Sequence, residues 1–220
     1  MIFINFKTYE QGTGANALRL IRLLDSVSES TGIKIVPVVQ VLDLKEASVV
    51  SDLPIWSQNI DPADYGAHTG SILPEAVKED GAQGTFLNHS EHRFKKLKDL
   101  EVAHARALEV GLKTLIFAGD TSELSKVAKL KPDFVSFEPP ELVGSKTTSV
   151  SEAKPEVIGK AVKIADKQGI PLIIGAGIKS AEDVRVGLAL GATGFAVASS
   201  VVTSNDPKGA VMDLIKGYGQ

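Results

Sequence analysis

The chain has 220 residues, of which 43% are hydrophobic and 23% charged, and its net charge is −3, which fits one or two globular domains with a large core and no basic patch for nucleic acid. Cysteine is absent, which excludes disulfides, thiolate catalysis and cysteine-ligated metal sites. No apolar run is long enough to span a bilayer and Met1 leads straight into a predicted strand, so we expect a cytoplasmic protein without membrane contact.

Eight short runs of β-branched or aromatic residues alternate with longer amphipathic segments. Most of the runs lack period-two alternation, which is typical of strands in a parallel sheet that is buried on both faces. In chain order the predicted strands are Ile2–Phe6, Ile33–Val39, Ile55–Ser57, Thr85–Asn88, Thr114–Ala118, Phe134–Phe137, Leu172–Gly175 and Gly194–Ala198.

The segments between these strands carry apolar stripes at helical spacing and signals for helix ends. Pro155 suits a first helical turn, and Ser180 suits an N-cap position. The clearest predicted helices are Ala17–Ser30, Leu100–Val110, Pro155–Gln168 and Ala181–Leu190. Eight strand–helix units without a break in composition predict a single-domain (β/α)8 TIM barrel over residues 1–220. Because a typical barrel has about 250 residues, we expect shortened helices, above all after the second and third strands.

Polar residues gather at the C-terminal ends of the predicted strands, which form the rim where barrel enzymes build their active sites. Glu138 ends an apolar run, and Pro139-Pro140 then excludes further strand or helix. The loop that follows, up to Lys154, could close over an acid or base at that position. Alone, Glu138 would be better interpreted as a surface residue. The other polar residues on the same rim favour a functional site: Asn5, Lys7, Gln58, Asn59, Asn88, His89, Ser90 and Glu91.

His89 and Lys7 are the candidate hydrogen-bond donor and cation of this rim. We predict a helix that begins near Ser90 or Glu91, and a helix N-terminus disfavours positive charge, so His89 should stay neutral and donate a hydrogen bond. A histidine that caps a loop is the alternative. Lys7 and Asn5 point the same way from the first strand, into the barrel, where Lys7 could hold an anion or form a Schiff base.

Small-residue turns follow the last two predicted strands. Gly175-Ala176-Gly177 and Ala198-Ser199-Ser200 leave backbone N–H groups accessible, and a short helix is expected to begin near Ser199. Such turns form the phosphate site of many barrel enzymes, so the substrate is expected to be small and phosphorylated. His68, His92 and His104 show no metal-ligand spacing, and no metal site is expected.

Four motifs along nearly the whole chain resemble those of the triosephosphate isomerase family. They are Asn5-Phe6-Lys7, Ser57-Gln58-Asn59, Asn88-His89-Ser90-Glu91-His92-Arg93 and Phe137-Glu138-Pro139. The segment from Pro139 to Gly144 is similar to the short archaeal version of the family's lid. The resemblance implies that D-glyceraldehyde 3-phosphate and dihydroxyacetone phosphate are interconverted without a cofactor, in glycolysis and gluconeogenesis.

The resemblance also implies a role for each matching residue. Glu138 would be the base, and His89 would be a neutral electrophile, a role for which this family is the standard example. Lys7 would balance the charge of the enediolate and phosphate, Asn5 would orient the substrate, and Glu91 would pair with Lys7. The residues implied to bind the phosphate are Val143, Gly144, Ser145, Gly175, Gly177, Ala198 and Ser199.

Two positions depart from the family pattern. Lys146 stands where the lid usually has a second glycine, and His68 stands at a usually apolar place in the loop that interlocks dimers. Some short archaeal members are tetramers, so a homo-oligomer, either dimer or tetramer, is expected.

Two alternatives to the isomerase stay open at this point. One is another sugar-phosphate barrel enzyme in which Lys7 forms a Schiff base, which borohydride trapping with substrate would decide. The other is a non-enzymatic phosphate-binding protein that kept the fold, because a fold alone does not establish a function.

Overall fold

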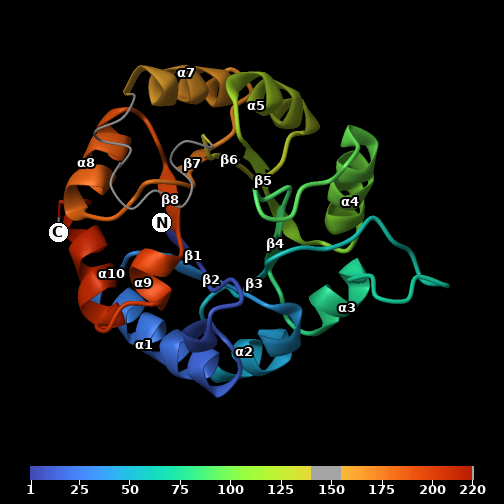
Figure 1. The fold of residues 1–220 in the computed structure, drawn as a ribbon, viewed down its shortest axis with the longest axis horizontal. Coiled ribbons are helices and arrows are strands. Elements are labelled where there is room, and N and C mark those ends of the chain that lie inside the picture. The colour runs from blue at the N-terminus through green and yellow to red at the C-terminus, as the bar shows by residue number, and fades with distance from the viewer. Residues whose placement is uncertain (140–154, 220) are drawn as a thin grey trace.

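Eight parallel strands close into a barrel in the computed structural model, which describes residues 1–139 and 155–219 (Figure 1). The strands are β1 Ile2–Asn5, β2 Ile35–Val39, β3 Trp56–Ser57, β4 Gly84–Leu87, β5 Lys113–Ala118, β6 Phe134–Phe137, β7 Leu172–Ile174 and β8 Gly194–Val197. Each strand pairs with the next, and β1 also pairs with β8, which closes the sheet. The predicted barrel is confirmed, and every strand bound lies within two residues of the prediction.

Helices form a ring around the barrel, as the view along its axis shows (Figure 1). They are α1 Ala15–Thr31, α2 Leu44–Val50, α3 Pro74–Glu79, α4 Leu97–Glu109, α5 Thr121–Val127, α7 Pro155–Asp166, α8 Ala181–Ala189, α9 Ser199–Val202 and α10 Pro207–Lys216, with 3-10 turns at Glu10–Gly12, Val41–Asp43 and Ala128–Leu130. As predicted, α2 and α3, which follow the second and third strands, are short. Within the residues described, none of these helices has the length and apolarity that a membrane crossing needs. That residues 1–220 form one domain stays a prediction.

Alternation along each strand divides the core into two layers. In β1, Ile2 and Ile4 belong to the layer between strands and helices, whereas Phe3 lies in the barrel interior. The interior cluster consists of Phe3, Val36, Val38, Trp56, Phe86, Leu115, Phe117, Ile173 and Ala196. Its rings meet edge to face, with 5.1 Å between the centroids of Phe3 and Trp56 and 4.7 Å between those of Phe86 and Phe117. This packed interior closes the bottom of the barrel beneath the polar residues of the rim.

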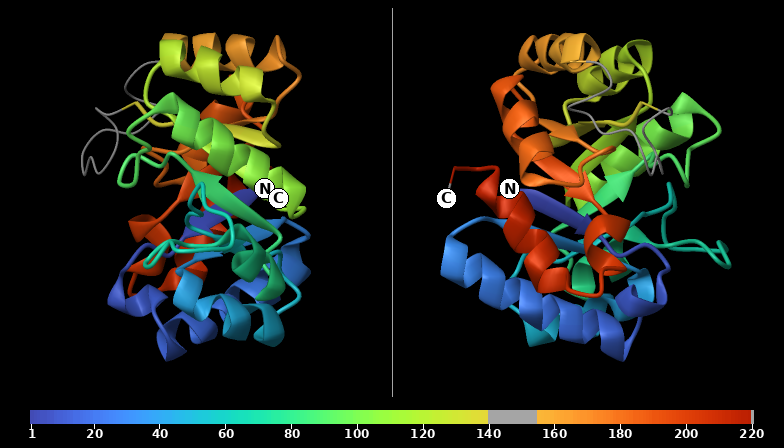
Figure 2. Two further views of the ribbon diagram at one scale, coloured as in Figure 1. Left: turned by 90° about the vertical axis from the view of Figure 1, so that its right-hand side faces the viewer. Right: turned by 60° about the vertical axis from the view of Figure 1, so that its left-hand side comes forward.

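The loop between β3 and α3 reaches away from the barrel (Figure 2). Arg106 of α4 contacts the middle of this loop, where its Nε lies 2.9 Å from Asp64 Oδ1, and its other nitrogens pair with Glu75 of α3 and Glu109 of α4. Tyr65, the next residue along the loop, is 74% exposed. The loop is therefore tied to α4 at Asp64 and presents an exposed aromatic ring beside that contact.

Candidate active site

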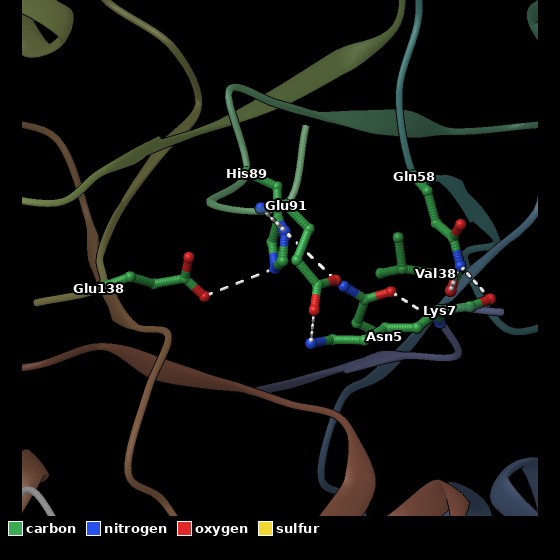
Figure 3. Close-up of polar contacts among 7 residues, drawn as sticks. All are labelled: Asn5, Lys7, Val38, Gln58, His89, Glu91 and Glu138. Atoms are coloured by element: carbon green, nitrogen blue, oxygen red, sulfur yellow. Dashed lines mark hydrogen bonds and ion pairs between the residues drawn. The ribbon is translucent and has the colours of Figure 1, made fainter. Parts of the chain in front are cut away.

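A cavity of about 600 Å³ opens where the strands end at the C-terminal rim. Side chains from three well-separated parts of the sequence converge on it (Figure 3). The predicted site residues that line it are Asn5, Lys7, His89, Glu138, Gly175, Gly177, Ala198 and Ser199. Glu91 does not line the cavity but pairs with Lys7, which does. The predicted residues Val143, Gly144 and Ser145, together with Lys146, lie outside the described residues.

Glu138 follows β6 and enters the cavity because alternation along that strand turns Ser136 and Glu138 inward. Its backbone N–H donates to the Ala118 carbonyl at 2.9 Å, and the residue is only 4% exposed. A Cβ atom at Gly175 would fall 2.6 Å from Glu138 Cγ, so glycine is needed there to admit the side chain. Strand alternation and the glycine at position 175 together place a carboxylate inside the cavity.

The electrostatic surroundings make Glu138 a candidate base near neutral pH. Burial raises the pKa of its carboxyl from 4.5 to about 7, while Ser90 and the nearby Lys7 oppose that rise. Although Ser90 lies close, neither its hydroxyl nor Glu138 Oε2 forms a hydrogen bond of ordinary geometry within the described part of the chain. The ionised carboxylate is thus poorly solvated. A carboxylate that is poorly solvated is a stronger base toward a proton bound to carbon.

The segment after His89 corrects one prediction. No helix begins at Ser90 or Glu91; a turn follows β4, and α4 begins only at Leu97. The backbone N–H of His92 donates to the His89 carbonyl at 2.8 Å, and that of Phe94 donates to Asn88 Oδ1 at 3.2 Å, so these groups serve the turn instead of a helix. The predicted helix start was wrong because hydrogen bonds close a turn after His89, and α4 begins only six residues after Glu91.

His89 is nevertheless expected to be neutral, for a different reason. Burial, and next the positive charge of Lys7, lower the pKa of its imidazole from 6.5 to about 4. The backbone N–H of Glu91 donates to Nδ1 at 3.1 Å, which assigns the proton of the neutral ring to Nε2. Nε2 lies 3.6 Å from Glu138 Oε1 (Figure 3). The ring packs edge-on against Phe117. The imidazole therefore presents an N–H donor to the cavity beside the carboxylate.

Lys7 is held in a left-handed backbone conformation, with φ 46°. Its N–H donates to Asn5 Oδ1 at 3.0 Å, and its carbonyl accepts from Gln58 Nε2 at 2.9 Å. Its Nζ lies 2.8 Å from Glu91 Oε1, so the predicted pairing of these two side chains is present (Figure 3). A non-glycine residue in this conformation is strained and persists only where its surroundings hold it. Contacts from the end of β1 and from the segments after β3 and β4 thus fix Lys7, with its ammonium group at the mouth of the barrel.

Several residues at the site were not singled out from the sequence. Tyr9, Phe117, Lys179 and Thr203 also line the cavity. Lys179 follows the glycine turn after β7, so its place on the rim could have been recognised. Among the residues that the structure describes, no cluster of three or more His, Asp or Glu side chains could hold a metal ion.

His104 has a structural explanation that fits its place in α4. Its Nε2 lies 3.0 Å from the Leu130 carbonyl and its Nδ1 lies 3.2 Å from Thr114 Oγ1, and burial lowers its pKa. These two contacts occupy both ring nitrogens and tie α4 to β5 and to the 3-10 turn Ala128–Leu130.

The family model for triosephosphate isomerase matches residues 1–217. The chain belongs to the triosephosphate isomerase family. It is 40% identical over 217 residues to the triosephosphate isomerase of Methanobacterium bryantii, covering 98% of this chain and 95% of that one. It is 41% identical to those of Methanothermus fervidus and Saccharolobus solfataricus, again over 98% of this chain and over 97% and 94% of theirs. The resemblance found from four short motifs is confirmed as membership of the triosephosphate isomerase family, and these relatives are archaeal proteins.

Proposed function

We propose that this chain catalyses the interconversion of D-glyceraldehyde 3-phosphate and dihydroxyacetone phosphate, a step of glycolysis and gluconeogenesis. The observation that carries the proposal is the meeting of three groups in one cavity: a buried carboxylate with raised pKa, an Nε2-protonated imidazole and a fixed ammonium. Membership of the family, and the names of the relatives, support the same reaction.

The proposed mechanism moves one proton between adjacent carbons and needs no external oxidant or reductant. Glu138 removes the proton from the carbon next to the carbonyl while His89 Nε2–H donates to the carbonyl oxygen, which forms an enediolate. Glu138 then returns the proton to the neighbouring carbon, and the second oxygen becomes the carbonyl. Lys7 offsets the negative charge of the enediolate and phosphate, and Asn5 orients the substrate.

The phosphate is proposed to bind at the turns after β7 and β8. Gly175, Gly177, Ala198 and Ser199 line the same cavity as Lys7 and Glu138, and α9 begins at Ser199 as predicted. Small side chains there leave backbone N–H groups within reach of an anion. Val143, Gly144 and Ser145 are proposed to complete the phosphate site from the loop.

The contacts of Lys7 favour the isomerase over an enzyme that forms a Schiff base. A Schiff-base lysine needs an apolar pocket or another cation to release its proton. The Lys7 amine is instead paired with Glu91 at 2.8 Å. Trapping with borohydride in the presence of substrate would reveal a covalent adduct if this interpretation were mistaken.

The direct test is turnover of glyceraldehyde 3-phosphate by the purified protein. Turnover is measured as the oxidation of NADH by a reductase that consumes the ketone product. We expect turnover without any added cofactor. Binding of the phosphorylated substrate without turnover would instead support the non-enzymatic alternative.

The pH dependence of kcat/KM should report the ionisation of Glu138 in the free enzyme. Because only the carboxylate can accept the proton, kcat/KM is expected to fall about tenfold per unit below a pH of about 7. His89, with a pKa of about 4, should add no step above pH 5. The substrate phosphate titrates near pH 6 and would add its own step to the profile. The start of the fall in kcat/KM is therefore measured between roughly pH 6.5 and 9. A profile that stays flat down to pH 6.5 would contradict the burial of the base.

The oligomeric state and the cellular location are two further predictions for this protein. A homo-oligomer, either dimer or tetramer, is supported by the projecting β3–α3 loop with its exposed Tyr65 (Figure 2). The cytoplasmic location stays a prediction.

A further inference from the structure

The backbone at Asn88 reverses the side-chain alternation of β4. Phe86 lies in the barrel interior and Leu87 in the layer under the helices, so simple alternation would turn Asn88 inward and His89 outward. The structure has the opposite arrangement: His89 lines the cavity, while Asn88 faces the Phe117 carbonyl and Glu123. Asn88 has φ 61°, in the left-handed region. The presence of His89 in the site therefore depends on this one backbone conformation.

Asn88 is buried, and both polar atoms of its side chain are held. Nδ2 donates to the Phe117 carbonyl at 3.0 Å and to Glu123 Oε1 at 2.9 Å, and Oδ1 accepts from the Phe94 N–H at 3.2 Å. Asparagine adopts the left-handed conformation more readily than other non-glycine residues, but the conformation still needs support from its surroundings. The contact with Glu123 supplies part of that support.

The Glu123 carboxylate joins the two loops that follow β4 and β5. Oε2 accepts from the Gly119 N–H at 2.7 Å, and both oxygens lie 3.1 Å from Arg93 Nη1. Asn88 and Arg93 stand on either side of His89 along the chain, so one carboxylate of α5 holds both ends of the turn. Each hydrogen-bond partner that the described residues give this carboxylate is a donor, which suits a carboxylate and not an amide.

We propose that Glu123 is a positioning residue for the reaction: through Asn88 and Arg93 it holds the turn that keeps the His89 imidazole in the cavity. It has no hydrogen bond to His89 itself and does not line the cavity of Glu138 and Lys7. The kinetic part of this inference rests on the proposed function, whereas the orientation of the imidazole does not.

The test compares Glu123→Gln with a matched control, Glu109→Gln. Both positions pair a glutamate with an arginine, but Glu109 lies at the far end of α4 and pairs with Arg106. In Glu123→Gln, the side-chain NH2 group would face hydrogen-bond donors that now bind the carboxylate. This loss of hydrogen bonds would weaken the contacts that hold the turn. We expect kcat to fall roughly 10- to 100-fold, as a small misplacement of a reacting group does, with KM within about threefold of the wild type. The control should match the wild type.

Imidazole nitrogen NMR of the ligand-free protein gives a readout that a merely structural role would not move. Wild type and Glu109→Gln should show His89 as a single Nε2–H tautomer. Glu123→Gln should show averaged nitrogen shifts, and so should Asn88→Gly, which allows φ 61° but removes the anchored side chain and serves if Glu123→Gln folds poorly. Unchanged His89 signals in these variants would overturn the proposal.

A double-mutant cycle separates positioning of His89 from a general loss of structure. If Glu123 acts through His89, adding Glu123→Gln to His89→Gln should lower kcat by less than about twofold. An equal loss in both backgrounds would overturn the proposal. A wild type without isomerase activity would instead count against the proposed function, and the NMR comparison would still decide the role of Glu123.

Discussion

Replacing Glu138 by glutamine is expected to lower kcat by roughly 10³- to 10⁴-fold, the upper part of the range for a general base. The amide has nearly the same shape but cannot accept the carbon-bound proton. Phosphate binding is proposed to involve other residues, so KM should stay within about threefold. Steady-state kinetics in both directions of the reaction measure both quantities.

The same substitution should stabilise the folded protein at alkaline pH. A raised pKa means that the fold favours the neutral carboxyl, so its contribution to stability is full below pH 4.5 and is lost as the pH rises through about 7. A shift from 4.5 to about 7 corresponds to an upper bound of about 3 kcal/mol in the free energy of unfolding at pH 8. Glutamine carries no charge, so denaturant unfolding of Glu138→Gln at pH 8 should show a gain of up to this size, and none at pH 4.

Glu79→Gln is the matched control, because this glutamate lies exposed at the end of α3. It should change neither kcat nor the pH dependence of stability. A loss of kcat below tenfold in Glu138→Gln would remove Glu138 as the base. An unchanged stability at pH 8 would mean that water solvates the carboxylate in the resting protein.

The barrel and the rim could be predicted from the sequence because they depend on local patterns. Apolar runs such as Phe134–Phe137 mark buried strands without reference to anything distant in the chain. The rule that strand ends meet on one rim then brings Lys7, His89 and Glu138 together without any knowledge of their contacts. The observed cavity contains all three.

The backbone conformations and the supporting contacts could not be predicted in this way. The φ values of Lys7 and Asn88 depend on hydrogen bonds with distant residues: Gln58 donates to the Lys7 carbonyl, and Glu123 accepts from the Asn88 side chain, across 51 and 35 residues. At the start of α5, Glu123 fits the ordinary preference for an acidic first turn, and Asp120 supplies the N-cap. That local preference accounts for a glutamate at this position without any long-range contact. The contacts with Asn88 and Arg93 are therefore seen only in the tertiary structure.

Replacing His89 by glutamine is the second large expected effect, with kcat lowered by roughly 10²- to 10³-fold, as for the loss of one oxyanion donor. A glutamine can donate an N–H, but it lacks the Glu91 contact to Nδ1 and the edge-on packing against Phe117 that fix the ring. His92→Gln is the control, since His92 is exposed in the same turn. A loss below tenfold in His89→Gln would contradict the assigned electrophile.

The residual activity of His89→Gln also tests the charge of His89. A neutral imidazole 3.6 Å from Glu138 Oε1 contributes little to the pKa of that carboxyl, so the acid limb of kcat/KM should stay near pH 7 in the variant. An imidazolium at the same place would hold the carboxyl pKa down, and its removal would move the limb upward by about one unit or more. An unmoved limb combined with a large loss of kcat would mean that His89 acts as a donor of a hydrogen bond and not as a positive charge.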